Sequence, residues 1–210
     1  MIKKNLKTMI ITSIIILLPI VAGVMLWEQL PDQIATHFNS NGQPDGWSPK
    51  EFAVFGLPLL LLAVHWLCVA ITGNDPKRKN ISDKMLTLVM WLCPVMSFAC
   101  CSATYLYALD SDINQKKLAM LLLGCIFVVI GNYLPKMKQS YTLGIKLPWT
   151  LNSEENWYRT HHFAGYVFMV GGVLAIIAGF MEWLGIAFIA LLFMAILPTI
   201  YSFMLYKKGI

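Results

Sequence analysis

Charged residues are scarce in this sequence. Only 13% of its 210 residues are Asp, Glu, Lys or Arg, against about 25% in ordinary soluble domains, while 58% are hydrophobic. The apolar residues come in long uninterrupted runs and not in amphipathic stripes. These features exclude an ordinary soluble enzyme and favour a protein that resides in a lipid bilayer.

Several motifs of soluble chemistry are also absent. The five cysteines form no CxxC pair and all lie in apolar runs, so we interpret them as packing residues and not as metal ligands or disulfides. The net charge of +5 is not gathered on one basic face, so no direct contact with nucleic acid is predicted. No Ser or Cys nucleophile is matched with a His and an orienting acid. We therefore predict no enzyme class, no metal and no cofactor.

What the sequence does contain is six apolar stretches without a charged residue. A helix needs roughly 20 apolar residues to cross the hydrocarbon core, and these stretches lack the alternating pattern of barrel strands. Because only helices and closed barrels satisfy their backbone groups in lipid, the predicted fold class is all-α, with six transmembrane helices. The predicted spans are Ile10–Trp27, Phe52–Thr72, Met85–Leu109, Leu118–Leu134, Phe163–Phe180 and Leu184–Met204.

The distribution of Lys and Arg predicts how the chain is oriented. Thirteen of these residues lie at the two termini, in the second loop and in the fourth loop, and only Lys50, Lys116 and Lys117 lie on the other side. Cytoplasmic loops carry the excess of positive charge, so both termini are predicted to be cytoplasmic. The first apolar run follows Lys3, Lys4 and Lys7 but is too long for a signal peptide, and we expect it to be retained.

Small residues mark the fifth predicted span. Gly171, Ala175 and Gly179 recur every four residues, a spacing that lets another backbone approach closely. One use of this face would be to bind another membrane protein, which would make the chain an accessory subunit. The short link at residues 181–183 predicts a tight antiparallel hairpin between the fifth and sixth spans.

The two long loops divide the chain and carry its candidate functional residues. We predict an N-terminal two-helix unit, residues 1–72, with an ordered outer cap loop at 28–51, and a four-helix unit, residues 85–210, with an inner loop at 135–162. The outer loop is rich in turn formers, and Asn41-Gly42 and Asp45-Gly46 favour left-handed positions. His37, Asp45 and Glu28 match no common metal-ligand spacing.

The inner loop is unusually apolar around Pro148, which predicts a re-entrant or interfacial segment. Asn152 or Ser153 can then cap a helix that begins with two acidic residues. Trp157, Arg159 and His161 would follow along that helix, and the simplest role for such aromatic and basic side chains is anchoring at the membrane interface.

His65 is the one ionisable side chain near the middle of a predicted span. Such residues are functional candidates by default, but a lone neutral His with a hydrogen-bond partner can also be structural. Without a second ionisable group it forms no visible proton relay. A transporter site would need polar groups near the midplane, usually in broken helices.

At the two loops the sequence resembles the SdpI family of bacterial multi-pass membrane proteins. The inner-loop resemblance rests on residues 132–136, on the run Gly144-Ile145-Lys146-Leu147-Pro148-Trp149-Thr150-Leu151, and on Trp157 and His161, with Arg159 between them. The outer-loop resemblance, to a domain of unknown function often joined to that family, rests on Pro31, His37, Asn39, Gly42 and Asp45.

The resemblance implies a cytoplasmic-membrane protein that protects the cell from a membrane-active toxic peptide and takes part in signal transduction to a cytoplasmic repressor. The family commonly has Arg-Thr where this chain has Lys146-Leu147, and lysine cannot replace the bidentate fork of arginine. The alternative function is a membrane enzyme or transporter that acts on a lipid or hydrophobic small molecule, with His37, His65, His161 or Arg159 at its site.

Overall fold

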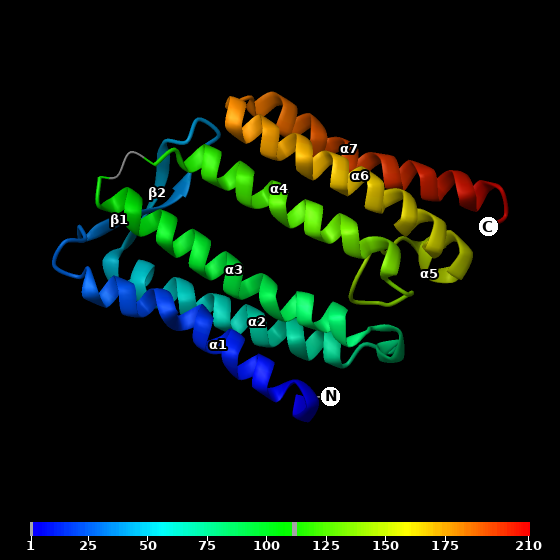
Figure 1. Cartoon of the computed structure of the whole chain (residues 1–210), viewed down its shortest axis with the longest axis horizontal. Coiled ribbons are helices and arrows are strands. Elements are labelled where there is room, and N and C mark those ends of the chain that lie inside the picture. The colour runs from blue at the N-terminus through cyan, green and yellow to red at the C-terminus, as the bar shows by residue number, and fades with distance from the viewer. Residues whose placement is uncertain (1, 111–112) are drawn as a thin grey trace. The chain divides into compact units, whose positions relative to one another are not determined.

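The computed structural model describes residues 2–110 and 113–210 and is dominated by helices (Figure 1). Six helices of the described chain are long and apolar enough to cross a membrane, which confirms the predicted architecture. The short helix α5 (Pro148–Asn152) lies in the inner loop, and a π-helical turn, Phe52–Gly56, precedes α2. The six long helices are α1 (Ile2–Met25), α2 (Leu57–Gly73), α3 (Asp83–Ala108), α4 (Gln115–Tyr133), α6 (Glu154–Met181) and α7 (Leu184–Lys207).

The chain divides into two compact units. One contains Met1–Gly73 and Leu86–Leu118, and the other contains Asn74–Met85 and Ala119–Ile210. Most of α3 therefore packs with α1 and α2, whereas the sequence division at residues 72 and 85 placed it with the later helices. A buried cluster explains the difference, because Leu86 and Met90 of α3 pack against Met9 of α1 and Val69 of α2.

The outer loop is ordered by a two-stranded antiparallel hairpin in the first unit. Strand β1 (Gln33–Phe38) pairs with β2 (Pro44–Pro49), and the strands are small enough that the fold remains mainly helical. Lys50 fixes the hairpin to the end of α1, because its Nζ donates to the carbonyl oxygens of Trp27 (3.3 Å) and Leu30 (3.0 Å). Trp27 and Leu30 follow the last residue of α1, Met25, so Lys50 satisfies carbonyl groups of the turn that connects α1 to the hairpin.

The two Gly positions expected to be left-handed in this loop behave differently. Gly42 has a φ of +79° and forms the turn, as predicted. Gly46 lies within β2 instead, and the left-handed prediction is wrong there. Its role is close approach: a Cβ at Gly46 would lie 2.8 Å from the Cβ of His37, next to an irregularity in the strand pairing.

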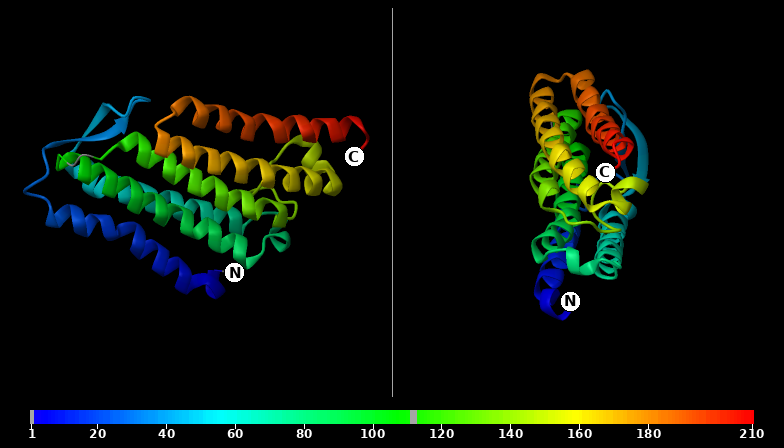
Figure 2. Two further views of the ribbon diagram at one scale, coloured as in Figure 1. Left: turned by 45° about the horizontal axis from the view of Figure 1, so that its top comes forward. Right: turned by 90° about the vertical axis from the view of Figure 1, so that its right-hand side faces the viewer.

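In the second unit, α6 and α7 form the predicted antiparallel hairpin (Figures 1 and 2). Glu182 ends α6 with a φ of +59° and its backbone N–H caps the carbonyl of Ala178. The small-residue face of α6 is covered by the unit itself: a Cβ at Gly171 would meet Met194 of α7 at 2.7 Å, and one at Gly179 would meet Met120 of α4 at 3.2 Å. The unit therefore uses this face for its own helix packing, at Met194 and Met120.

Candidate functional site

Five of the residues predicted in the inner loop meet in one place. We call Gly144, Ile145, Thr150, Trp157 and His161 the inner-loop cluster. Gly144 has a φ of +106°, and a Cβ there would lie 2.5 Å from His161 Nε2 and 2.8 Å from two carbons of the Trp157 ring. Only glycine combines this backbone conformation with that close approach. The loop is thereby held against the first turns of α6.

Hydrogen bonds fix the ring of His161 in one tautomer. The backbone N–H of Ile145 donates to Nε2 (2.9 Å), so Nε2 carries no hydrogen, and Nδ1 must donate to the carbonyl of Trp157 (2.8 Å). The His161 side chain is fully buried and stacks on the Trp157 ring at a centroid distance of 4.0 Å. Trp157 Nε1 in turn donates to the carbonyl of Met137 (2.8 Å). His161 is therefore enclosed between the loop and α6, with both ring nitrogens hydrogen-bonded to the backbone.

Thr150 closes the same loop from α5. Its buried hydroxyl accepts the Leu147 N–H (2.8 Å) and can donate to the Ile145 carbonyl, which lies 2.8 Å away. The interaction caps α5 and ties it to the segment that contacts His161. Within the motif run, Ile145, Leu147 and Thr150 are thus joined by hydrogen bonds to one another and to His161.

Two polar residues that the sequence analysis missed support this loop from outside the motif. Asp75 accepts the backbone N–H groups of Tyr141 (2.9 Å) and Thr142 (2.8 Å), the Thr142 hydroxyl and the Lys77 N–H. Burial alone would raise its pKa, but these donors stabilise the carboxylate and hold the pKa below 3.8. Its only sequence signal was an acid before Pro76 in a basic loop, a pattern typical of a turn.

Gln139 is the second of these supports. Its side-chain amide donates to the carbonyls of Thr150 (2.8 Å) and Leu151 (2.9 Å) and accepts from Lys77. Asn80 donates to its backbone carbonyl (2.7 Å). The loop between α2 and α3 is therefore joined to the inner loop within the second unit. No sequence pattern predicted this pairing, since the residues lie about 60 positions apart.

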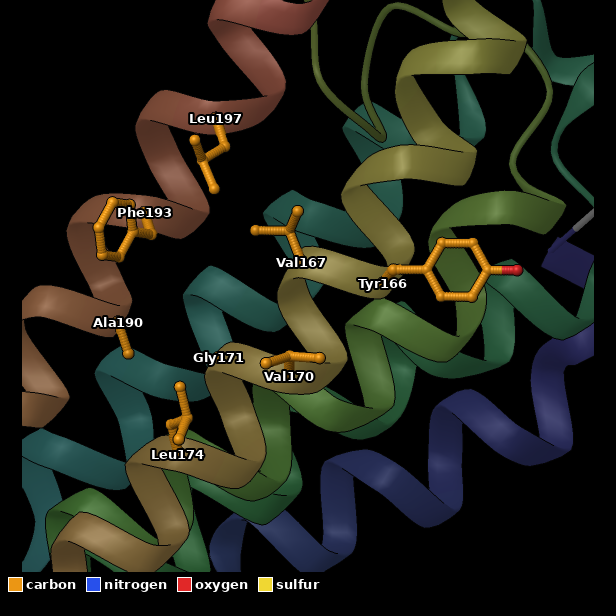
Figure 3. A pocket seen from close by; sticks show the side chains of 8 residues that line it. All are labelled: Tyr166, Val167, Val170, Gly171, Leu174, Ala190, Phe193 and Leu197. Carbon is orange, nitrogen blue, oxygen red and sulfur yellow. The ribbon is translucent and has the colours of Figure 1, made fainter.

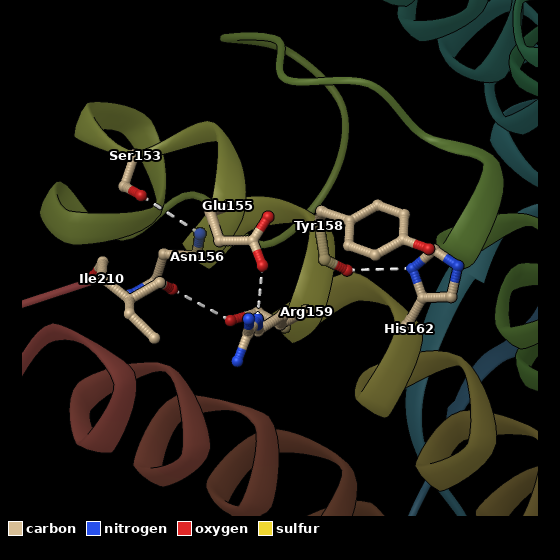
Figure 4. A network of polar contacts seen from close by, with 8 residues as sticks. Ser153, Glu155, Asn156, Tyr158, Arg159, His162 and Ile210 are labelled. Carbon is tan, nitrogen blue, oxygen red and sulfur yellow. Dashed lines mark hydrogen bonds and ion pairs between the residues drawn. The ribbon is translucent and has the colours of Figure 1, made fainter. Parts of the chain in front are cut away.

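The first turns of α6 carry a second polar network (Figure 4). Ser153 caps the helix by accepting the Asn156 N–H (3.1 Å), which confirms one of the two predicted caps. The buried Asn156 side chain donates to the carbonyls of Ser202 and Ile210, both at 3.1 Å, and accepts from the Thr160 hydroxyl at 3.1 Å. These bonds join the start of α6 to the end of α7.

The remaining inner-loop candidates lie outside the cluster. Lys146 and Pro148 are exposed, and Arg159 forms an exposed ion pair with Glu155 (2.5 Å). Trp149 packs against α7, where its ring stacks on Tyr206 at a centroid distance of 5.8 Å. Lys146 Nζ donates to the Thr142 carbonyl (3.4 Å) from its exposed position.

The outer-loop candidates organise the hairpin. His37 Nδ1 and Asp45 Oδ1 lie 2.5 Å apart on its exposed surface. Asn39 Oδ1 accepts the N–H groups of Asn41 (2.9 Å) and Gln43 (3.1 Å) and so shapes the turn before Gly42. Pro31 is exposed just before β1. In the described part of the chain, no three His, Cys, Asp or Glu side chains gather into a group that could hold a metal ion.

His65 lies apart from both loops. It is fully buried in the first unit, and its Nε2 is 3.1 Å from the Thr12 hydroxyl. Its Nδ1 has no partner among the described residues. This environment contains one hydrogen bond and no neighbouring ion pair, which favours the structural interpretation of His65.

An apolar groove of about 360 Å³ lies along the α6 and α7 hairpin (Figure 3). No charged side chain lines it, and Figure 3 shows the Tyr166 ring pointing away from α7. The groove lacks the convergent polar groups that a transporter site needs. Its lining residues are Tyr166, Val167, Val170, Gly171, Leu174, Ala190, Phe193 and Leu197.

Comparison with known proteins identifies both loop regions. Residues 136–202 match the model of the SdpI/YfhL protein family, and this match contains the whole inner-loop cluster. The chain carries an SdpI-family segment. Residues 14–62, which contain the hairpin, match a domain of unknown function, DUF1648.

The similarity extends beyond these two segments. The chain is 25% identical to the immunity protein SdpI of Bacillus subtilis (strain 168) over 206 residues, which cover 97% of this chain and 98% of that protein. No solved structure matches the chain. Both family segments exclude Asp75, His65 and Thr12. The hydrogen bonds that Asp75 accepts from Tyr141 and Thr142 therefore join the SdpI-family segment to a residue outside it.

Proposed function

We propose that this protein is a membrane immunity protein of the SdpI type, which protects a bacterial cell from a membrane-active toxic peptide. The observation that carries the proposal is the similarity to the Bacillus subtilis immunity protein along nearly the full length of both chains.

The two loops are proposed to have different roles. The hairpin exposes Trp47, the His37 and Asp45 pair and its turn, and such an aromatic side chain with a charged neighbour suits contact with an amphipathic peptide. Thr150, Trp157 and His161 of the inner-loop cluster are buried, and the cluster holds α5, α6 and the preceding loop together. We therefore assign recognition of the peptide to the hairpin and maintenance of the fold to the cluster.

Survival of a peptide-sensitive bacterium that expresses the protein tests this proposal. We expect the full chain to raise survival, and Trp47→Ala to lower it by about tenfold, the effect of losing one aromatic contact residue. Trp183→Ala is the matched control, because Trp183 is also an exposed tryptophan in a turn on the side predicted to be extracellular. Equal killing with and without the protein would contradict the proposal.

Signalling to a cytoplasmic repressor is proposed as a separate step. The surface assigned to it is the exposed part of the Gly144–His161 region, with Lys146, Pro148 and Arg159, since both termini and this loop are predicted to be cytoplasmic. A cysteine-accessibility experiment on Lys146→Cys and Trp47→Cys would test the orientation on which this step depends. Labelling of Trp47→Cys from the cytoplasmic side would reverse the assignment of both loops.

A further inference from the structure

Two segments of the second compact unit carry an excess of positive charge. They are residues 74–85, which lead from the end of α2 into the first turn of α3, and residues 134–140, which follow α4. We call these segments the basic loops. Together they contain six Lys or Arg and only two Asp. One of these acids, Asp75, is buried, and both of its carboxylate oxygens already accept hydrogen bonds.

A hydrogen bond between the basic loops brings their lysines together. The Asn80 side chain donates to the backbone carbonyl of Gln139 (2.7 Å), and Lys77 Nζ donates to the Gln139 side chain. Each of the two residues joined at 2.7 Å directly follows a lysine, Lys79 or Lys138. The bond therefore places on adjoining loops two lysines that are 59 positions apart in the sequence.

The charges of these lysines are accessible to an anion from outside the chain. Lys79, Lys84 and Lys138 are exposed, and within the part of the chain that the structure describes they have no hydrogen-bond or ion-pair partner. Lys136 is also exposed, and its Nζ donates to the uncharged side chain of Asn132 (3.2 Å). No acidic side chain therefore neutralises these four ammonium groups among the described residues.

The basic loops adjoin the ends of spanning helices. Asp83 begins α3 and Tyr133 ends α4, and both helices are long and apolar enough to cross a membrane. Lys136 Nζ lies 5.1 Å from the centroid of the Tyr133 ring. Lys77 Nζ lies 5.8 Å from the centroid of the exposed Tyr141 ring. Tyrosine and lysine side chains at the end of a span lie at the level of the lipid headgroups.

We propose that the basic loops bind the headgroups of anionic phospholipids at the membrane surface. Clusters of roughly four to eight Lys and Arg directly beside a spanning helix attract anionic headgroups on the cytoplasmic side, the side predicted for both loops. A lipid fits better than an acidic protein segment, because the lysines lie at span ends, where headgroups are always present. The surface is independent of toxin recognition, since no hairpin residue contributes to it.

Lipid binding to the purified full chain in detergent tests this proposal. Energy transfer from the tryptophans to a tail-labelled lipid reports binding of phosphatidylglycerol or of phosphatidylcholine, which has the same phosphate but no net charge. We expect phosphatidylglycerol to bind more tightly. The preference should disappear near 1 M sodium chloride, where the screening length falls to about 3 Å. Equal binding of both lipids at low salt would overturn the proposal.

Two competitors distinguish the sources of negative charge. Sodium phosphate, at an ionic strength matched with sodium chloride, should displace phosphatidylglycerol no more than the chloride does. Stronger displacement by phosphate would overturn the lipid assignment in favour of a free-anion site. Binding of a hexaglutamate peptide without binding of phosphatidylglycerol would overturn it in favour of an acidic protein partner.

A double variant connects the binding to the basic loops. Lys79→Gln with Lys138→Gln removes one exposed charge from each loop, and the affinity for phosphatidylglycerol should fall by about 20-fold, since each lysine near a membrane surface contributes about fivefold. Lys207→Gln with Lys208→Gln is the matched control, because it removes two exposed lysines of the same unit that lie outside the basic loops. An equal loss in both double variants, or no loss in the first, would overturn the proposal.

Discussion

Replacing Gly144 by alanine should destabilise the inner-loop cluster more than a Gly→Ala substitution at any other loop glycine. The new Cβ would lie 2.5 Å from His161 Nε2, and the φ of +106° disfavours any L side chain. A residue in such a backbone region costs about 1–3 kcal/mol, and overpacking of a buried site typically costs about 1–3 kcal/mol more. Displacement of the His161 ring would also break its bond with the Ile145 N–H.

These contributions share the same atoms and do not add fully, so we expect a loss of roughly 3–5 kcal/mol. For a chain of this length that corresponds to a fall of about 6–20 °C in unfolding temperature. The measurement is thermal unfolding of the full chain in detergent, with the fraction of protein that stays monodisperse recorded at each temperature. Protection of a peptide-sensitive host should be lost in parallel at its growth temperature.

Two other glycines separate the causes of this effect. Gly209 also has a positive φ, +81°, but no atom lies within 4 Å of its added Cβ, so Gly209→Ala measures the backbone cost alone. Gly185 in α7 has open space and no positive φ, so Gly185→Ala should be neutral or slightly stabilising. If Gly144→Ala lowers the unfolding temperature no further than Gly209→Ala, the close contact with His161 does not have the role assigned here.

Three further changes test other parts of the structure. Asp75→Asn should destabilise the second unit by about 1.5–3 kcal/mol, the range for hydrogen bonds to a charged group. Because the pKa of Asp75 in the folded protein lies below 3.8, this stability is present above pH 3.8 and is lost as the pH falls through the folded pKa. Unfolding curves of the variant should therefore lack that acid dependence. Gly172→Ala should lower the unfolding temperature through a 2.7 Å contact with the Gly124 carbonyl, and an unchanged temperature would exclude this close helix crossing. His65→Leu should leave thermal stability unchanged or higher, because it removes a buried Nδ1 without a partner; lost protection with unchanged stability would instead indicate a functional His65.

The sequence alone determined the spans and the location of the candidate segments. Hydrophobic runs specify membrane helices because the bilayer leaves the backbone few alternatives, and six such helices are present. The capping role of Ser153 and the turn at Gly42 were also predictable, because both depend on neighbouring residues. The orientation of the chain stays a prediction from its charge distribution.

Only the tertiary structure decided which candidates act together. Gly144 and His161 were recognised as motif residues, but their contact depends on a left-handed turn that brings the loop back onto α6. Asp75 and Gln139 carried no strong signal, since their partners lie far away in the sequence and hydrogen bonds between loops leave no periodic pattern. The apolar sequence determined that the chain enters the membrane, whereas its few buried polar groups, satisfied only by distant partners, decided how the loops are held.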